Sequence, residues 1–127
     1  MEVQQDHEFV SDPLRIHAIL NNLISNATQY YDAAKSNPYA KIIIKTDPTQ
    51  ASIKVEDNGM GIDSDQQQAV FDMFYRGSRN STGSGLGLYI VKEIVNRLGG
   101  IVDLSSHLGH GTVVEVKLRN RQRLKEE

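Results

Sequence analysis

Two asparagines one helical turn apart, Asn22 and Asn26, stand in a stretch whose apolar residues recur at helical spacing. Asparagine is a poor residue for the interior of a helix, and residues four apart lie on the same face. One explanation is a polar face turned toward water. The other is a ligand site, because side-chain carbonyl oxygens suit Mg²⁺, which takes its remaining ligands from water and phosphates.

A second candidate site is the run DNGMGI, residues 57–62, which follows a predicted strand. Asn-Gly is a common hairpin turn. However, Gly59 and Gly61 also leave a backbone without side chains, which a flat ring can approach closely. Asp57 can accept a hydrogen bond from the exocyclic amine of adenine, whereas guanine presents an acceptor oxygen at that place. The run is therefore either a turn or an adenine site.

Three further segments could contact a nucleotide. GSGLGL, residues 83–88, opens a predicted helix, and bare backbone N–H groups at a helix N-terminus bind anions. Neither a dinucleotide fingerprint nor a phosphate loop is completed, so a linker before a helix is an equal alternative. Arg76 and Arg79 precede it and are either solvated or clamp a phosphoryl group. GHGT, residues 109–112, is a hairpin turn or brings backbone and the Thr112 hydroxyl near a base.

The elements that would position these residues follow from hydrophobic spacing and turn residues. We expect a weak strand over 3–10, a helix from Pro13 to about Tyr31, with Asp12 as its N-cap, and a hairpin of strands 41–46 and 51–56. A helix over 64–75, a mobile loop over 76–85, a helix over 86–98 stopped by Gly99-Gly100 and a hairpin of strands 101–106 and 112–118 complete the chain. The predicted fold class is an α/β two-layer sandwich, with a mixed, mostly antiparallel sheet and three helices on one face.

The composition of the chain excludes several classes of function. The chain of 127 residues suits a single domain spanning 1–127. A net charge of -2 gives no basic excess for binding nucleic acid. The absence of cysteine excludes disulfides and thiolate metal sites, and no apolar run reaches the roughly 20 residues that cross a bilayer. With no signal-peptide pattern at the N-terminus, we expect a cytoplasmic domain.

Taken together and in order, the motifs resemble the ATP-binding catalytic domain of sensor histidine kinases. DPLRIHAILNNLISNATQY, DNGMGI, FDMFYRGS, GSGLGLYIVKEIVNRLGG and GHGT correspond to that family's N, G1, F, G2 and G3 boxes, and the resemblance covers residues 12 to 118. It implies the Bergerat, or GHKL, fold, with ATP and Mg²⁺ as cofactors. The five ordered boxes make chance similarity a poor explanation.

The resemblance also assigns roles to residues. Asn26 would be the principal Mg²⁺ ligand, with Asn22 beside it, and Asp57 would accept the adenine amino group. Arg76 would lie nearest the γ-phosphate in a mobile lid over 72–84. The other nucleotide contacts implied by the motifs are Tyr30, Gly59, Gly61, Ile62, Arg79, Gly83, Gly85, Leu86, Gly87 and Thr112.

Two positions bear on which member of the superfamily this is. The family most often has lysine where this chain has Gln29, so a degenerate interaction module that has lost ATP is one alternative. GHKL ATPases and serine kinases, the other alternative, carry a general-base glutamate at the place of Asn22. An amide takes no proton at neutral pH, whereas a neutral imidazole acceptor already has a free lone pair. Asn22 therefore favours transfer to histidine.

The resemblance finally implies partners. The acceptor histidine is expected on an upstream dimerisation domain that this chain lacks, rather than at His7, which only six residues precede. The phosphoryl group would pass to an aspartate on a response-regulator receiver domain. The isolated domain would be a monomer that binds ATP without phosphorylating itself, and the parent protein a homodimer.

Overall fold

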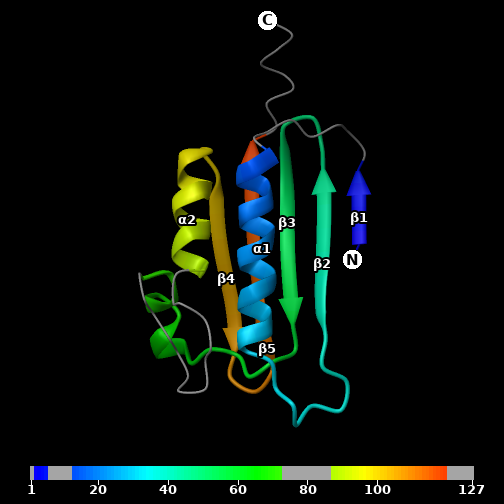
Figure 1. The fold of residues 1–127 in the computed structure, drawn as a ribbon, viewed down its shortest axis with the longest axis vertical. Helices are drawn as coiled ribbons and strands as arrows, with labels where there is room; N and C mark the ends of the chain where they lie inside the picture. The colour runs from blue at the N-terminus through cyan, green and yellow to red at the C-terminus, as the bar shows by residue number, and fades with distance from the viewer. Residues whose placement is uncertain (1, 6–12, 73–86, 120–127) are drawn as a thin grey trace, which may run out of the picture.

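The chain folds as one sheet covered on one face by helices in the computed structural model, which describes the backbone of residues 2–5 and all atoms of 13–72 and 87–119. The strands are β1 (Glu2–Gln5), β2 (Ala40–Thr46), β3 (Gln50–Asp57), β4 (Ile101–His107) and β5 (Gly111–Arg119). Their spatial order is β1-β2-β3-β5-β4, with β1 parallel to β2 and the other pairs antiparallel (Figure 1). The predicted mixed, mostly antiparallel sheet is confirmed.

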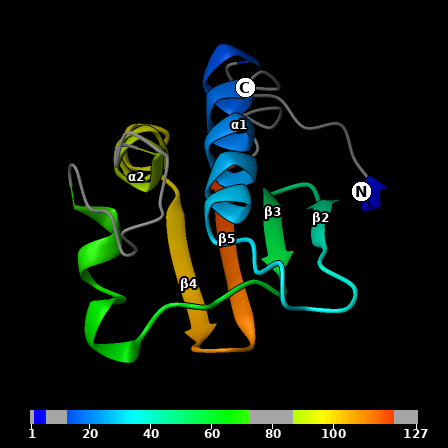
Figure 2. The ribbon, with the colours of Figure 1, turned by 60° about the horizontal axis from the view of Figure 1, so that its bottom comes forward.

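Two α-helices lie on the same face of this sheet, α1 (Pro13–Gln29) and α2 (Gly87–Arg97) (Figures 1 and 2). Each turns an apolar stripe toward the strands, because its apolar residues recur every three to four positions. The described residues contain no helix that is both long and apolar enough to span a membrane. The two-layer α/β sandwich expected from the sequence is therefore confirmed.

The core lies between the helices and the central strands. In β3 every second residue from Ala51 to Asp57 is buried, the alternation expected of a strand with one covered face. Full burial of an aliphatic side chain stabilises a fold by about 1.5–3 kcal/mol. The apolar core side chains that are at most 3% exposed are Ile19, Leu23, Ala51, Ile53, Val55, Ile62, Val91, Val95, Val114, Val116 and Leu118.

The turns that join these elements use the residues expected of them. Between β2 and β3, the Asp47 carboxylate accepts hydrogen bonds from the backbone N–H groups of Thr49 and Gln50, each at 2.8 Å. After α2, the Gly100 N–H donates to the Val95 carbonyl at 2.9 Å, which closes the last helical turn. The predicted stop at Gly99-Gly100 is confirmed. The expected N-cap at Asp12 lies outside the described residues.

The helix expected over 64–75 is wrong for the part that can be described. Two short 3₁₀ turns stand there, η1 (Ser64–Gln66) and η2 (Ala69–Phe71), and Asp72 is extended. Val70 is the only buried residue between 64 and 72, so no apolar stripe exists to hold an α-helix against the core. The expected strand over 3–10 is β1 over Glu2–Gln5, and residues 6–10 lie outside the described ranges.

Candidate functional site

The two asparagines lie on α1, and neither of their side chains is exposed to solvent as on a polar helix face. Asn22 is half-buried, and its Nδ2 donates to the Ala18 carbonyl at 2.7 Å. That bond turns Oδ1 the other way, to a point 3.6 Å from where a Cβ on Gly87 would stand. Asn26, one turn later, is 7% exposed. The Asn22 amide therefore lies beside the start of α2, and the Asn26 side chain is buried.

Asp57 is a buried carboxylate at the end of β3. It is 6% exposed, its Oδ1 accepts the Gly59 N–H at 2.9 Å, and the Thr112 N–H also donates to it. Burial raises the pKa of Asp57 above its ordinary value, and Glu56 adds a smaller rise, while the two backbone N–H groups partly offset these. A buried carboxylate whose pKa is raised by desolvation is a candidate for a functional site.

The glycines of the DNGMGI loop are required by the protein's own backbone. A Cβ on Gly59 would overlap the carbonyl of Tyr30 at the end of α1, and a Cβ on Gly61 would overlap the carbonyl of His107 at the end of β4. Gly61 also has a φ of 75°, in the region that favours glycine. Close packing is therefore one reason for both glycines, and the approach of a flat ring stays a prediction.

Hydrogen bonds hold this loop to the elements on both sides. The Met60 N–H donates to the Tyr30 carbonyl at 2.8 Å, and the Met60 carbonyl accepts the Gly109 N–H at 2.7 Å. The Asn58 side chain accepts from the Tyr39 N–H at 2.7 Å and donates to the Asn37 carbonyl at 2.8 Å. A loop fixed in this way presents Asp57 in one orientation, so little ordering is needed before a ligand binds.

Behind the loop lies a polar cluster that the sequence analysis missed. Ser106 and Thr112 are 6% and 2% exposed, and their hydroxyl oxygens are 2.8 Å apart. The Ser106 Oγ also accepts the Ile62 N–H at 2.7 Å, and Gln67 Nε2 donates to the carbonyls of Ile62 and Ser106. The sequence did hold one signal: Ser106 continues the inward alternation of Val102 and Leu104, where an apolar residue is expected.

Most of the predicted site residues fall into three groups. The structure brings Asn22 close to Gly87, Gly59 against Tyr30, and Asp57 beside Thr112, across the paired ends of β3 and β5. Ile62, 3% exposed, belongs to the core. The predicted residues and segments outside the described ranges are Arg76, Arg79, Gly83, Gly85, Leu86, the greater part of the expected lid, and His7.

Two hollows can be described, and neither lies against the asparagine face. One of about 170 Å³ reaches Asp57 and Gly59 but borders α1 at Ala27 and Thr28, with Tyr31 beyond the end of the helix. At roughly 100° per residue, the side chains of Ala27 and Thr28 lie around the helix from Asn26. Gly87 itself lies close to Asn22, since a Cβ built on it would be in van der Waals contact with Asn22 Oδ1 at 3.6 Å.

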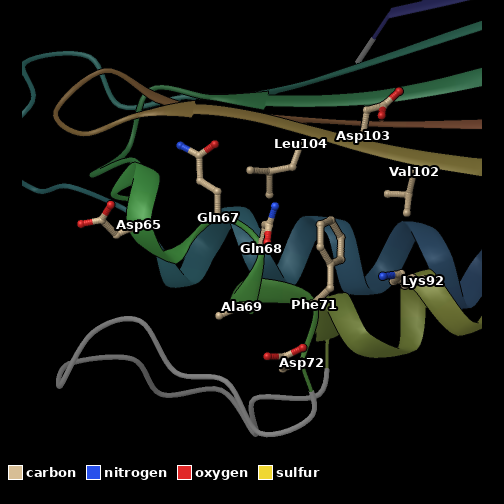
Figure 3. Close-up of a pocket in the computed structure, with 10 residues that line it drawn as sticks. All are labelled: Asp65, Gln67, Gln68, Ala69, Phe71, Asp72, Lys92, Val102, Asp103 and Leu104. Atoms are coloured by element: carbon tan, nitrogen blue, oxygen red, sulfur yellow. The ribbon is translucent and has the colours of Figure 1, made fainter.

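The larger hollow, of about 810 Å³, lies between η1–η2, α2 and β4 (Figure 3). Phe71, Val102 and Leu104 give it an apolar side, and the Lys92 ammonium lies 5.6 Å from the centroid of the Phe71 ring. Asp72 and Asp103 line it as well, with Asp65, Gln67, Gln68 and Ala69. It contains none of the predicted nucleotide contacts.

The donor set fits a hard divalent cation better than a soft one. The described residues hold no group of three or more His, Cys, Asp or Glu that could enclose a metal ion. The two asparagine carbonyls are oxygen ligands, and the ordered Asn22 amide leaves its oxygen available. Oxygen ligands supplied in small number, with water and phosphate completing the shell, are what Mg²⁺ accepts.

Comparisons with known proteins identify the family of this chain. The family model described as "Histidine kinase-, DNA gyrase B-, and HSP90-like ATPase" matches residues 11–122. Sensor protein SrrB of Staphylococcus aureus (strain NCTC 8325 / PS 47) is 37% identical over 110 residues, which are 82% of this chain and 18% of SrrB. The chain therefore spans a small part of that relative's length.

Solved structures give the same result. The mycobacterial sensor histidine kinase MprB matches with a TM-score of 0.75 and 26% identity, over 93% of this chain and 79% of that one. A nucleotide-free form of the catalytic domain of histidine kinase ThkA matches with a TM-score of 0.73 and 25% identity, over 93% and 78%. The chain belongs to the histidine kinase-, DNA gyrase B- and HSP90-like ATPase family, as a catalytic ATP-binding domain of the sensor histidine kinase type.

Proposed function

We propose that this domain binds Mg·ATP between the asparagine face of α1 and the glycine loop, and donates the γ-phosphate to a histidine on an adjacent dimerisation domain. The observation that carries the proposal is the pairing of a buried, pre-oriented carboxylate at Asp57 with two amides on one helical face. The carboxylate would accept a hydrogen bond from the amino group of a purine, and the amide oxygens would be ligands for a hard cation.

The base end of the site works through Asp57. Two backbone N–H groups, from Gly59 and Thr112, orient its carboxylate. Its remaining acceptor sites would accept the exocyclic amine of adenine. Guanine or hypoxanthine would place an oxygen there, so two acceptors would meet without a proton between them. Discrimination between purines then follows from the charge of one side chain.

The phosphate end works through Asn26 and Asn22. Their carbonyl oxygens would hold Mg²⁺, which neutralises phosphate charge when it is bound. Helix α2 is 11 residues long and begins at Gly87. The backbone N–H groups of its first turn would point at the phosphates. Arg76 and Arg79, from the expected lid, would add positive charge in place of the lysine that Gln29 does not supply.

The absence of a carboxylate at position 22 favours histidine as the acceptor. Phosphoryl transfer depends mainly on positioning and charge neutralisation, and a neutral imidazole needs no base to free its lone pair. Water or a serine hydroxyl would need one, and Asn22 is an amide whose Nδ2 is already committed to the Ala18 carbonyl. We therefore expect slow ATP hydrolysis and transfer of the γ-phosphate to histidine. The phosphoryl group would then pass to an aspartate of a receiver domain.

The test is to join the domain to the upstream segment of its parent protein and incubate it with γ-labelled Mg·ATP. We expect acid-labile, base-stable label that disappears when the upstream histidine is replaced by glutamine or when Asn26 is replaced by alanine. The isolated domain serves as a control and should stay unlabelled. Rapid ATP hydrolysis without phosphohistidine would overturn the proposal in favour of an ATPase. No nucleotide binding at all would favour the degenerate interaction module.

A further inference from the structure

The hydrogen bonds around Ser106 fix the direction of every proton in the cluster. A serine hydroxyl has one donor and two acceptor sites. The Gly111 carbonyl, 2.9 Å from Ser106 Oγ, can only accept, so Ser106 must donate there. The Ile62 N–H, at 2.7 Å, occupies one acceptor site of Ser106. In the hydrogen bond between the two hydroxyl groups, at 2.8 Å, Thr112 Oγ1 is therefore the donor and Ser106 Oγ the acceptor. Ser106 is fully used, and the Thr112 proton is committed to it.

This saturated hydroxyl joins two segments that are far apart in the sequence. Ile62 ends the glycine loop, whereas Gly111 and Thr112 begin β5. These two segments supply the N–H groups of Gly59 and Thr112 that orient the Asp57 carboxylate. If their separation changed, the two donors would no longer converge on the same side chain. Ser106 holds both segments through a single oxygen atom.

Gln67 braces the same junction from its more exposed side. Its Nε2 donates to the Ile62 carbonyl at 3.0 Å and to the Ser106 carbonyl at 2.8 Å. One amide group therefore uses both of its protons on the loop and on β4. Gln67 is half-buried, so its removal should disturb the core far less than removal of Ser106. Each residue offers an independent way to loosen the junction.

We propose that Ser106 and Gln67 are positioning residues that hold the glycine loop and the start of β5 in register, and so set the preference of the site for adenine. The inference rests on the proposed function, because it concerns how Asp57 reads the base. Neither side chain contacts the nucleotide. With the register lost, the carboxylate would rotate among several orientations and lose most of its hydrogen bond to the exocyclic amine. ITP, which never makes that bond, would lose little.

The test measures the dissociation constants of Mg·ATP and Mg·ITP by calorimetry for four variants of the whole domain. Ser106→Ala and Gln67→Ala loosen the junction. Ser105→Ala, at an exposed neighbour on β4, and Gln66→Ala, at an exposed neighbour in η1, are the matched controls. Circular dichroism and thermal unfolding establish which variants keep the native fold, since a partly unfolded population would lower the apparent affinity for both nucleotides by the same factor.

We expect the preference for ATP over ITP to fall about tenfold in Ser106→Ala and about threefold in Gln67→Ala, the size of one charge-assisted hydrogen bond lost or weakened. The controls should keep the wild-type preference. An unchanged ratio in folded Ser106→Ala and Gln67→Ala would overturn the positioning role, and if Ser106→Ala does not fold, Gln67→Ala decides the question alone. Failure of the wild type to bind ATP would instead overturn the proposed function.

Discussion

The sharpest single perturbation is Asp57→Asn, which keeps the shape of the side chain and removes its charge. Asparagine still has one carbonyl oxygen, so the Gly59 N–H can keep the acceptor that it now has at 2.9 Å, and the Thr112 N–H, which also donates to the carboxylate, must share that oxygen. The second oxygen becomes an NH₂ group, a donor directed at the place where the base is expected. The substitution therefore separates the structural role of the residue from its role in reading the base.

For binding, we expect a large loss of ATP affinity. The hydrogen bond between the adenine amine and the ionised carboxylate is worth about 1.5–3 kcal/mol, which is roughly a 10- to 150-fold change in the dissociation constant. ITP should lose nothing, because its oxygen gains a donor in the amide of the substituted side chain. The ratio of the two affinities, measured by calorimetry in the presence of Mg²⁺, should therefore invert.

For stability, the expected change has the opposite sign. Burial raises the pKa of Asp57 above its ordinary value of 3.8, so the folded state disfavours the charged form. The ligand-free wild type consequently loses stability as the pH rises from about 3.8 through the raised pKa. Asp57→Asn removes this loss, and at pH 7 the variant should unfold at the same temperature as the wild type or higher. ATP binding to the wild type should strengthen over the same rise in pH.

The outcome that refutes this reasoning is specific. ATP affinity within twofold of the wild type, in a folded Asp57→Asn protein, would mean that this carboxylate does not contact the base. A fall in stability of about 2 kcal/mol or more at pH 7 would mean that the charge stabilises the folded state. Burial would then not disfavour the charged form of Asp57.

Three other substitutions test separate parts of the account. Asn22→Glu places a carboxylate beside Gly87 and should raise ATP hydrolysis at least tenfold, since a general base typically contributes about 10² or more; unchanged release of inorganic phosphate would remove Asn22 from the site. Gln29→Lys should tighten ATP binding severalfold at low salt and less at high salt, and a salt-independent affinity would contradict the charge argument. Ile19→Ala, at a fully buried side chain, should destabilise the domain by about 2–5 kcal/mol in urea unfolding, whereas Leu14→Ala, at a residue 83% exposed, should leave the midpoint unchanged.

The strong elements were predictable because their local pattern and their packing agree. The apolar spacing around Ile19 and Leu23 defined α1, and the alternation in KIIIKT and ASIKVE defined the hairpin of β2 and β3 to within a residue at each end. The expected helix over 64–75 failed because its conformation depends on distant partners. Gln67, in the middle of it, is bound to the Ser106 carbonyl, 39 residues away.

The candidate site was predictable only where polar residues interrupt an apolar pattern. Asn22, Asn26 and Asp57 did so visibly, whereas Ser106 did so at the end of β4, where the neighbouring residues are polar as well and the interruption is harder to recognise. The packing reason for Gly59 could not be seen in the sequence, because it depends on the approach of the α1 carboxyl end across the fold. Sequence patterns therefore identify ligand-binding groups more readily than they identify the residues that hold those groups in place.

The central claim is that one cleft binds a purine triphosphate together with its divalent cation. Its most direct test is a calorimetric titration of the domain with ATP, first with Mg²⁺ and then with excess chelator. We predict saturable binding of one nucleotide per chain with Mg²⁺, and at least tenfold weaker binding without it, a difference that Asn26→Ala should abolish. No heat of binding in either condition, or an affinity indifferent to Mg²⁺, would contradict the account.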